Sequence, residues 1–289
     1  MDISDSQNFL NDKWLVLELI KKSSINKNDI VLDIGAGEGI ISLILSDLCK
    51  KVIAIELDNN LFIKLKKKFE KIINIEIINR DFLSSSLPDL DYKVFSNIPF
   101  NQTSSIINKL FFSQNPPQDS YLIIQKEAAL RFMGEGEGTL VSLLLKPFFN
   151  LSILYNFKRT DFTPPPSVDI VLLRIQKLQC PLISQDELQL YKNFMSFIIL
   201  QQSSSLKKRV RRLFMPAEFY SICKILNLNP KGTIKKIAFE QWLGLFKYFL
   251  SLKNQKTFNN KIKLIQNSFK KYLSIKDNQP KVRKTRFKR

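Results

Sequence analysis

Residues 30–39 read IVLDIGAGEG, and this stretch decides the fold. Its first half, residues 30–34, is an apolar run that predicts a strand, and the amphipathic residues 38–49 predict a helix. Three glycines at alternate positions, Gly35, Gly37 and Gly39, lead from the strand into the start of the helix. Glycine lets a backbone turn tightly and come close to a ligand. The stretch therefore predicts a ligand-binding turn between a strand and a helix, a pattern that dinucleotide dehydrogenases also use.

Strand and helix patterns alternate through the rest of residues 30–175. Strands are expected at 30–34, 52–56, 74–79, 93–97 and 121–125. Helical stretches follow at 38–49, 59–71 and 103–112, with a short one up to residue 132. Two further strands, 151–157 and 168–175, have no helix between them. This order predicts an α/β fold, with a mainly parallel sheet, helices on both faces and a terminal hairpin. Such a sheet is the Rossmann-like arrangement of class I methyltransferases.

The pattern changes to helical periodicity beyond about residue 176. Apolar residues recur there at spacings of three and four in two stripes, Leu188, Tyr191, Phe194, Met195 and Ile198, and Phe239, Trp242, Leu243, Phe246 and Phe249. We therefore expect a catalytic domain at 1–177 and a small C-terminal helical domain at 178–275. The polar, basic residues 276–289 predict a tail that is disordered when unbound.

The positive charge is concentrated in the second part of the chain. The 289 residues include 45 Lys and Arg against 26 Asp and Glu, a formal net charge of +19. Residues 1–175 hold 20 basic and 21 acidic residues, whereas residues 176–289 hold 25 and 5. A basic part joined to a neutral part indicates a nucleic-acid-binding surface that serves a separate active site. A biased genome composition is the alternative, but the first part shares that bias without the charge.

The densest basic cluster predicts a contact with nucleic-acid phosphates, which give affinity but no sequence choice. Its members are Lys207, Lys208, Arg209, Arg211 and Arg212, on an expected helix. Other residue types are absent or sparse: the chain has no histidine, and its three cysteines lie far apart. We therefore expect no metal site and no mechanism that needs an imidazole base. With no secretory signal and no apolar run near ~20 residues, we expect a cytoplasmic protein without a membrane part.

Two acidic residues end neighbouring strands at the edge of the sheet where ligands bind. Glu56, followed by Leu57, can accept hydrogen bonds from both hydroxyls of a ribose. Asp81 can accept from an adenine amine, and the ring of Phe82 can cover the base. NAD and S-adenosylmethionine both require the first acid, but the second favours S-adenosylmethionine. Asp33 either braces the glycine turn or acts near the sulfonium of the cofactor.

Residues 97–100 read NIPF and end the fourth strand. An adenine amine is a poor nucleophile because its lone pair is delocalised into the ring, and acceptors that draw its N–H groups out of the plane free that lone pair. The side-chain oxygen of Asn97 and the carbonyl of Ile98 or Pro99 can do this, since proline fixes φ. Phe100 offers a flat face for a flipped base. The motif is either a plain turn or, behind this cofactor site, the catalytic motif of an adenine methyltransferase.

These motifs together resemble those of the Erm-type ribosomal RNA adenine N6-methyltransferases over about residues 7–250. The matching segments are 7–10 (Q-N-F motif), 33–39 (D-I-G-A-G-x-G), 97–100 (N-I-P-Y/F), 162–168 (F-x-P-x-P-x-V) and 239–243 (C-terminal helix). The resemblance implies S-adenosylmethionine as cofactor, 23S ribosomal RNA as partner and resistance to macrolide, lincosamide and streptogramin B antibiotics. It also implies a monomer whose basic cluster binds RNA. It adds Asn8, Leu10 and Asn97 to the cofactor contacts and places Phe162 opposite the target base.

Two alternatives stay open. Small-subunit ribosomal RNA dimethyladenosine transferases share the fold and the opening motif, but they usually have leucine at the position of Ile98 and P-G in the glycine loop. Ile98 and the glycine loop therefore favour the Erm type. A non-catalytic RNA-binding factor that kept the fold is the second alternative. The sequence leaves open whether one or two methyl groups are added.

Overall fold

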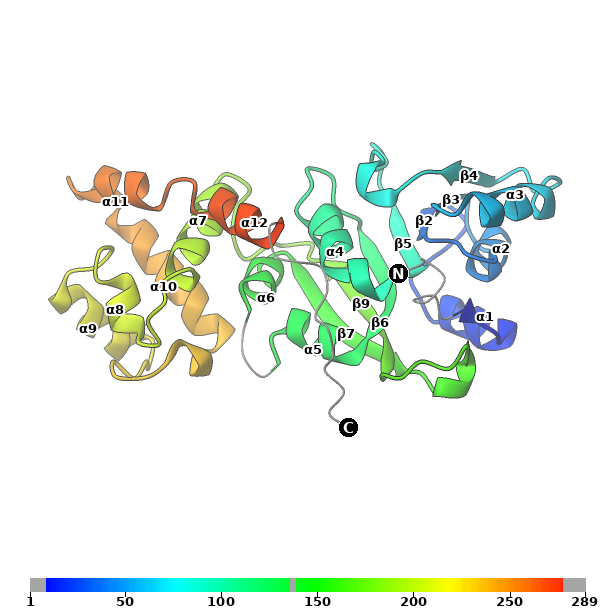
Figure 1. Cartoon of the computed structure of the whole chain (residues 1–289). Coiled ribbons are helices and arrows are strands. Elements are labelled where there is room, and N and C mark those ends of the chain that lie inside the picture. The colour runs from blue at the N-terminus through cyan, green and yellow to red at the C-terminus, as the bar shows by residue number, and fades with distance from the viewer. Residues whose placement is uncertain (1–8, 136–138, 278–289) are drawn as a thin grey trace. The chain divides into compact units, whose positions relative to one another are not determined.

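The computed structural model describes residues 9–135 and 139–277 (Figure 1). The chain forms two compact units. Of the described residues, the first unit comprises 9–130 and 149–179, and the second comprises 131–135, 139–148 and 180–277. The domain limits expected from the sequence stay a prediction, and the expected tail lies almost wholly outside the described residues.

The first unit is built on a seven-stranded sheet with the order β4-β3-β2-β5-β6-β9-β7. Its strands are β2 (Ile30–Ile34), β3 (Lys51–Glu56), β4 (Ile75–Asn79), β5 (Lys93–Asn97), β6 (Asp119–Gln125), β7 (Phe149–Asn156) and β9 (Ile170–Lys177). The strands from β4 to β6 run parallel, and β9 lies antiparallel between β6 and β7. This arrangement confirms the predicted fold class, including the hairpin after the last parallel strand.

Helices cover the sheet because its central strands are buried along almost their whole length. The helices of this unit are α1 (Lys13–Lys21), α2 (Ile40–Ser46), α3 (Asn59–Lys68), α4 (Thr103–Phe111) and the first part of α5 (Lys126–Met133). Side-chain oxygens begin two of them: Asp12 accepts from the backbone at the start of α1, and Asp58 does so at the start of α3. Helices α1 and α2 share one core cluster with β2, β3, β5 and β6.

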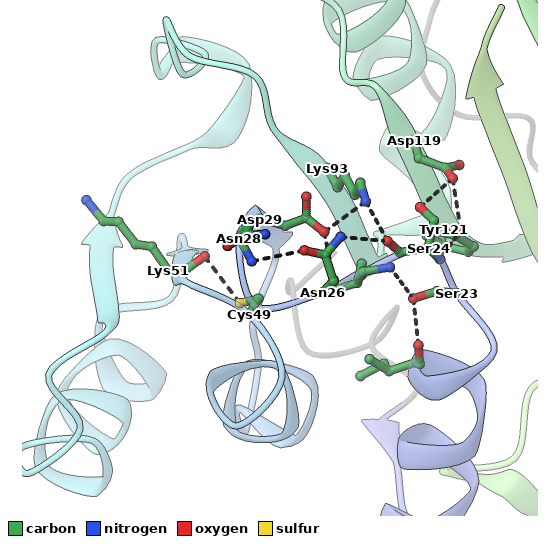
Figure 2. Close-up of polar contacts among 12 residues, drawn as sticks. Ser23, Ser24, Asn26, Asn28, Asp29, Cys49, Lys51, Lys93, Asp119 and Tyr121 are labelled. Carbon is green, nitrogen blue, oxygen red and sulfur yellow. Dashed lines mark hydrogen bonds and ion pairs between the residues drawn. The ribbon is translucent and has the colours of Figure 1, made fainter.

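A polar network fastens the amino ends of β2, β5 and β6 (Figure 2). Lys93, at the start of β5, forms an ion pair with Asp29 at 2.8 Å and donates to the carbonyl of Ser24. The Ser24 hydroxyl donates to Asp119, at the start of β6, at 2.8 Å. The Tyr121 hydroxyl accepts from the Ser24 backbone N–H at 2.7 Å and donates to Asp119. The segment between α1 and β2 therefore ties three strands together at this edge.

At their carboxyl ends, β2 and β5 are not paired through their backbones. β2 pairs with β3 as far as Ile34, and β5 pairs with β6 as far as Asn97. Between β2 and β5, however, the ladder stops at Leu32 and Val94. The backbone pairing of the two strands therefore ends before their carboxyl ends, at the point where the strand order reverses direction. Ligands bind at such a point in open α/β sheets.

A second, two-stranded sheet joins two motifs that are far apart in the sequence. β1 (Phe9–Leu10) pairs antiparallel with β8 (Phe162–Thr163). Asn11 strengthens the link, because its side-chain amide donates to the Thr160 carbonyl and to the Thr163 hydroxyl. Two-residue strands have no readable periodicity, so the sequence did not predict this pairing.

The second unit is helical. Its helices are α6 (Leu140–Leu145), α7 (Leu188–Ile199), α8 (Leu206–Val210), α9 (Pro216–Ile225), α10 (Phe239–Ser251), α11 (Phe258–Ile265) and α12 (Ser268–Asp277). The stripes expected on α7 and α10 meet in an aromatic core, where ring centroids are 5.0 Å apart for Tyr191 and Phe246 and 4.9 Å apart for Phe194 and Phe249. The predicted helical region is therefore confirmed. The sequence missed α6, because a six-residue apolar run does not separate helix from strand.

Candidate active site

A cavity of about 370 Å³ lies at the carboxyl ends of β2, β3 and β5, beyond the last backbone pairing of β2 with β5. Its volume is within the range of pockets that hold a small cofactor. Most of the residues predicted for cofactor and substrate line it. They are Leu10, Gly35, Gly37, Glu56, Leu57, Asp81, Phe82, Asn97, Ile98, Pro99 and Phe100. The structure thus brings together side chains from five separate segments of the chain.

The glycine turn forms one wall of the cavity. Gly35 and Gly37 have φ of +72° and +57°, a conformation that favours glycine. A Cβ atom on Gly37 would lie 2.9 Å from the ring of Phe9, which also lines the cavity. Gly39 has a different role from the one expected. It does not line the cavity, and a Cβ there would lie 2.5 Å from Leu65 of α3, so Gly39 allows α2 and α3 to pack closely.

Glu56 lies at the base of the cavity with only 3% of its surface exposed. One carboxylate oxygen accepts from the Gly37 backbone N–H at 2.7 Å, and the other accepts from the Asp58 backbone N–H at 2.8 Å. These bonds fix the carboxylate beside the glycine turn. A carboxylate has about four acceptor positions, so Glu56 keeps the capacity to accept from a pair of ribose hydroxyls.

Asp81 and Phe82 form the neighbouring wall. One oxygen of Asp81 accepts from the Leu83 backbone at 2.9 Å and begins the short helix η2 (Phe82–Ser84). Phe82 is 4% exposed and lines the cavity. The ammonium of Lys109, a residue of α4, lies 5.0 Å from the centroid of the Phe82 ring. Lys109 also donates to the carbonyls of Leu83 and Ser85. The loop that carries Asp81 is therefore held to α4.

The NIPF motif lines another part of the same cavity. Pro99 has φ −58° and ψ 125°, and its carbonyl accepts from the Gln102 backbone in the short helix η3 (Phe100–Gln102). The Pro99 carbonyl is therefore engaged, which favours the Ile98 carbonyl of the two candidates that the sequence left open. Phe100 is half-buried between the cavity and the core cluster around β5.

Asp33 braces the structure behind the glycine turn. It is 1% exposed and does not line the cavity. One of its oxygens accepts from the Ser42 hydroxyl at 2.6 Å, and the other lies 3.3 Å from the Ser96 hydroxyl. Burial raises the pKa of Asp33 to about 7, with a smaller contribution from the charge of Glu56. Of the two roles that the sequence left open, this geometry favours the bracing one.

Besides Gly39, one further predicted residue among those described does not line the cavity. Phe162 is 1% exposed, does not line the cavity, and packs edge-on against Phe157 with ring centroids 5.3 Å apart. Asn8 lies outside the described residues. Sequence reasoning also missed lining residues, notably Phe9 and Arg80. Their signals were present, since Phe9 belongs to the Q-N-F motif and Arg80 precedes Asp81, but neither residue type indicates a cofactor contact by itself.

The basic cluster is divided by the structure. Lys207, Lys208, Arg211 and Arg212 are exposed at α8 and the turn after it. Arg209 points inward, is 9% exposed, and donates to the carbonyls of Ile198 and Ile199 at 2.7 Å. The prediction that Arg209 contacts RNA is therefore wrong. Its guanidinium satisfies carbonyls at the end of α7, and burial lowers its pKa.

Among the residues at 9–135 and 139–277, no group of three His, Cys, Asp or Glu side chains is arranged to hold a metal ion. Over the same described part of the chain, no helix has the length and apolarity that crossing a membrane requires.

Comparison with known proteins decides the family. The family described as ribosomal RNA adenine dimethylase matches residues 1–251. The chain belongs to this family. It is 32% identical over 246 residues to an rRNA adenine N-6-methyltransferase of Limosilactobacillus reuteri, which covers 85% of this chain and 95% of that protein. It is also 32% identical over 278 residues to a probable ribosomal RNA small subunit methyltransferase A of Methanococcus aeolicus, covering 91% and 97%.

Solved structures share the fold. The crystal structure of the 23S rRNA methyltransferase ErmE has a TM-score of 0.76 at 23% identity, over 84% of this chain and 99% of that one. A dimethyladenosine transferase from Plasmodium falciparum has a TM-score of 0.63 at 23% identity, over 91% and 98%. The chain is thus an rRNA adenine methyltransferase, and the predicted enzyme class is confirmed. The predicted cofactor, S-adenosylmethionine, is that of the family.

The ionisation of Asp33 gives a testable pH dependence of stability. The folded-state pKa of about 7 lies above the unfolded value of about 4. The folded protein therefore binds more protons than the unfolded chain between these values, and the contribution of Asp33 to the free energy of unfolding decreases as the pH rises from 4 to 7. We expect the Tm of the wild type, measured relative to Asp33→Asn, to fall between pH 5 and pH 8. Asp47→Asn, at an exposed position, is the control, and a constant difference between wild type and Asp33→Asn contradicts the prediction.

Proposed function

We propose that this enzyme transfers methyl groups from S-adenosylmethionine to the N6 amine of an adenine in 23S ribosomal RNA. In the cell, this modification would confer resistance to macrolide, lincosamide and streptogramin B antibiotics. The observation that carries the proposal is that Asn97 to Phe100 line the same cavity as Glu56 and Asp81. An acceptor-rich motif thereby shares a cavity with a site suited to an adenosine cofactor.

The residues of the cavity fit the cofactor. Glu56 keeps acceptor capacity for a ribose, Asp81 lies one strand further on, and Phe82 adds an apolar ring for a base. The glycine turn brings backbone close to the methionine end, as its positive φ values allow. S-adenosylmethionine, when bound, supplies an electrophilic methyl group. The protein's own task is then to hold and orient the target amine.

The NIPF motif can perform that task without a strong base. The Asn97 side-chain oxygen and the Ile98 carbonyl accept from the two N–H groups of the adenine amine, which leaves its lone pair free to react. Phe100 stacks on the base once it has left its helix. The rate gain comes mainly from positioning, and the surplus proton leaves to water. The absence of histidine from the chain is consistent with such a mechanism.

The choice of the large subunit depends on two sequence features. Ile98 stands where small-subunit enzymes usually have leucine, and the G-A-G turn at 35–37 lacks their P-G. Ile98 is 1% exposed and lines the cavity, so it contributes to the shape of the site itself. Relatives of both kinds are 32% identical to the chain, which makes the small-subunit enzyme the second candidate.

We also propose that the exposed cations at 207–212 bind RNA phosphates. Lys207, Lys208, Arg211 and Arg212 are exposed close together in sequence, and Lys207 hydrogen-bonds the hydroxyl of Tyr220 at 2.7 Å. Tyr220 is 50% exposed, so that an aromatic ring lies beside the cations. Cations with an exposed ring are typical of surfaces that bind single-stranded RNA.

The substrate can be tested with radiolabelled cofactor. We expect label to enter protein-free 23S RNA and not assembled small subunits. Asn97→Ala should abolish incorporation while RNA binding, measured by filter retention, persists. Label that enters only small subunits contradicts the large-subunit proposal. Retained incorporation by Asn97→Ala contradicts the catalytic role of the motif.

The RNA surface gives a separate prediction. Lys208→Ala with Arg211→Ala should weaken RNA binding and reduce the slope of log affinity against log salt by about 1 to 2, because each phosphate contact releases counterions. Arg209→Met is the matched control inside the same cluster: it should lower the thermal stability of the protein while the salt slope stays unchanged. An unchanged slope for the double variant would show that these cations do not contact RNA.

A further inference from the structure

Ser96 occupies the place where the ladder between β2 and β5 is missing. That ladder ends at Leu32 and Val94. Continued by two residues in the same register, it would put Ile34 opposite Ser96. The strands do not pair there through their backbones, although each still pairs with its other neighbour at this level.

The hydroxyl of Ser96 takes over the backbone bonds. Its oxygen accepts from the Ile34 N–H at 2.7 Å, and the hydroxyl lies 2.7 Å from the Ile34 carbonyl, to which it donates. The same oxygen is 3.3 Å from the carboxylate of Asp33. Ser96 is fully buried, and Asp33 is 1% exposed. One side chain thus connects two strands at a level where their backbones do not pair.

The residues that follow on each strand line the same cavity. Gly35 follows Ile34 and opens the glycine turn, whereas Asn97 follows Ser96 and opens the NIPF motif. The two segments approach each other closely, since a Cβ atom on Gly35 would lie 3.6 Å from Cδ of Pro99. The Ser96 bonds therefore lie one residue away from both segments and fix their separation.

We propose that Ser96 is a positioning residue that sets the distance between the cofactor turn and the catalytic motif. The inference rests on the proposed role of Asn97. The residues proposed to hold the cofactor lie mainly on the β2, β3 and β4 side of the missing ladder, and the groups that orient the adenine lie on the β5 side. Loosening the connection should therefore impair the transfer step more than cofactor binding.

Ser120 shows that a buried serine in this sheet does not require such bonds. It lies on β6, next to β5, and is also fully buried. Among the described residues its hydroxyl has no hydrogen-bond partner. Ser120→Ala therefore matches Ser96→Ala in burial, strand environment and chemical change, and differs in the loss of the cross-strand bonds.

The test compares Ser96→Ala with Ser120→Ala in the full-length protein. Two quantities are measured: kcat for methylation of 23S RNA fragments, and Kd for S-adenosylhomocysteine by calorimetry, which needs no RNA. For Ser96→Ala we expect kcat to fall about 10-fold or more, because small displacements of reacting groups have effects of this size, and Kd to change less than about threefold. Ser120→Ala should leave both near the wild-type values.

Ser96→Cys covers the case in which Ser96→Ala does not fold. The thiol has a similar size but forms weaker hydrogen bonds, so kcat should fall by an intermediate factor while Kd is kept. Equal kcat values for the Ser96 and Ser120 variants overturn the inference, as does a parallel loss of kcat and cofactor affinity, which would indicate a purely structural role. If the wild type methylates no ribosomal RNA, the proposed function fails instead, and the two failures remain distinguishable.

Discussion

The structure depends on how strands β2, β5 and β6 are joined. A polar network links their amino ends, whereas the backbone pairing of β2 with β5 ends before their carboxyl ends. At the amino ends, the ion pair between Lys93 and Asp29 and the bonds of Ser24 hold β2, β5 and β6 together. At the carboxyl ends, the backbone pairing of β2 with β5 ends after Leu32 and Val94. The cavity lies at these ends, and the polar network at the amino ends keeps the three strands joined.

The chemistry follows from the same geometry. The main lining residues lie at the carboxyl ends of strands: the glycine turn follows β2, Glu56 ends β3, Asp81 follows β4 and Asn97 ends β5. Rigid strands can therefore position both the cofactor and the target amine within one cavity. A reaction that needs orientation more than proton transfer suits such a site, and it explains how a chain without histidine can be an enzyme of this family.

Hydrophobic patterns in the sequence predicted the strand bounds and the acidic residues at the strand ends. The bounds of β2 and β5 agree with the prediction because both strands have a buried, mainly apolar centre. The acids after β3 and β4 were found because the ends of parallel strands meet at one edge.

The sequence did not predict features that depend on strand register, on very short elements or on the packing of distant helices. The pairing of β1 with β8 involves two residues on each side. α8 has five residues, too few for periodicity to show that Arg209 points inward. The role of Gly39 became visible only with the position of α3.

The most direct measurement of the central claim is a map of methylated adenines in the ribosomal RNA of cells with and without this gene. Our account predicts that one adenine of 23S RNA gains N6-methyl groups in cells with the gene, and that the same cells carrying Asn97→Ala show none. Methylation confined to small-subunit RNA, or identical maps in all three strains, would contradict it.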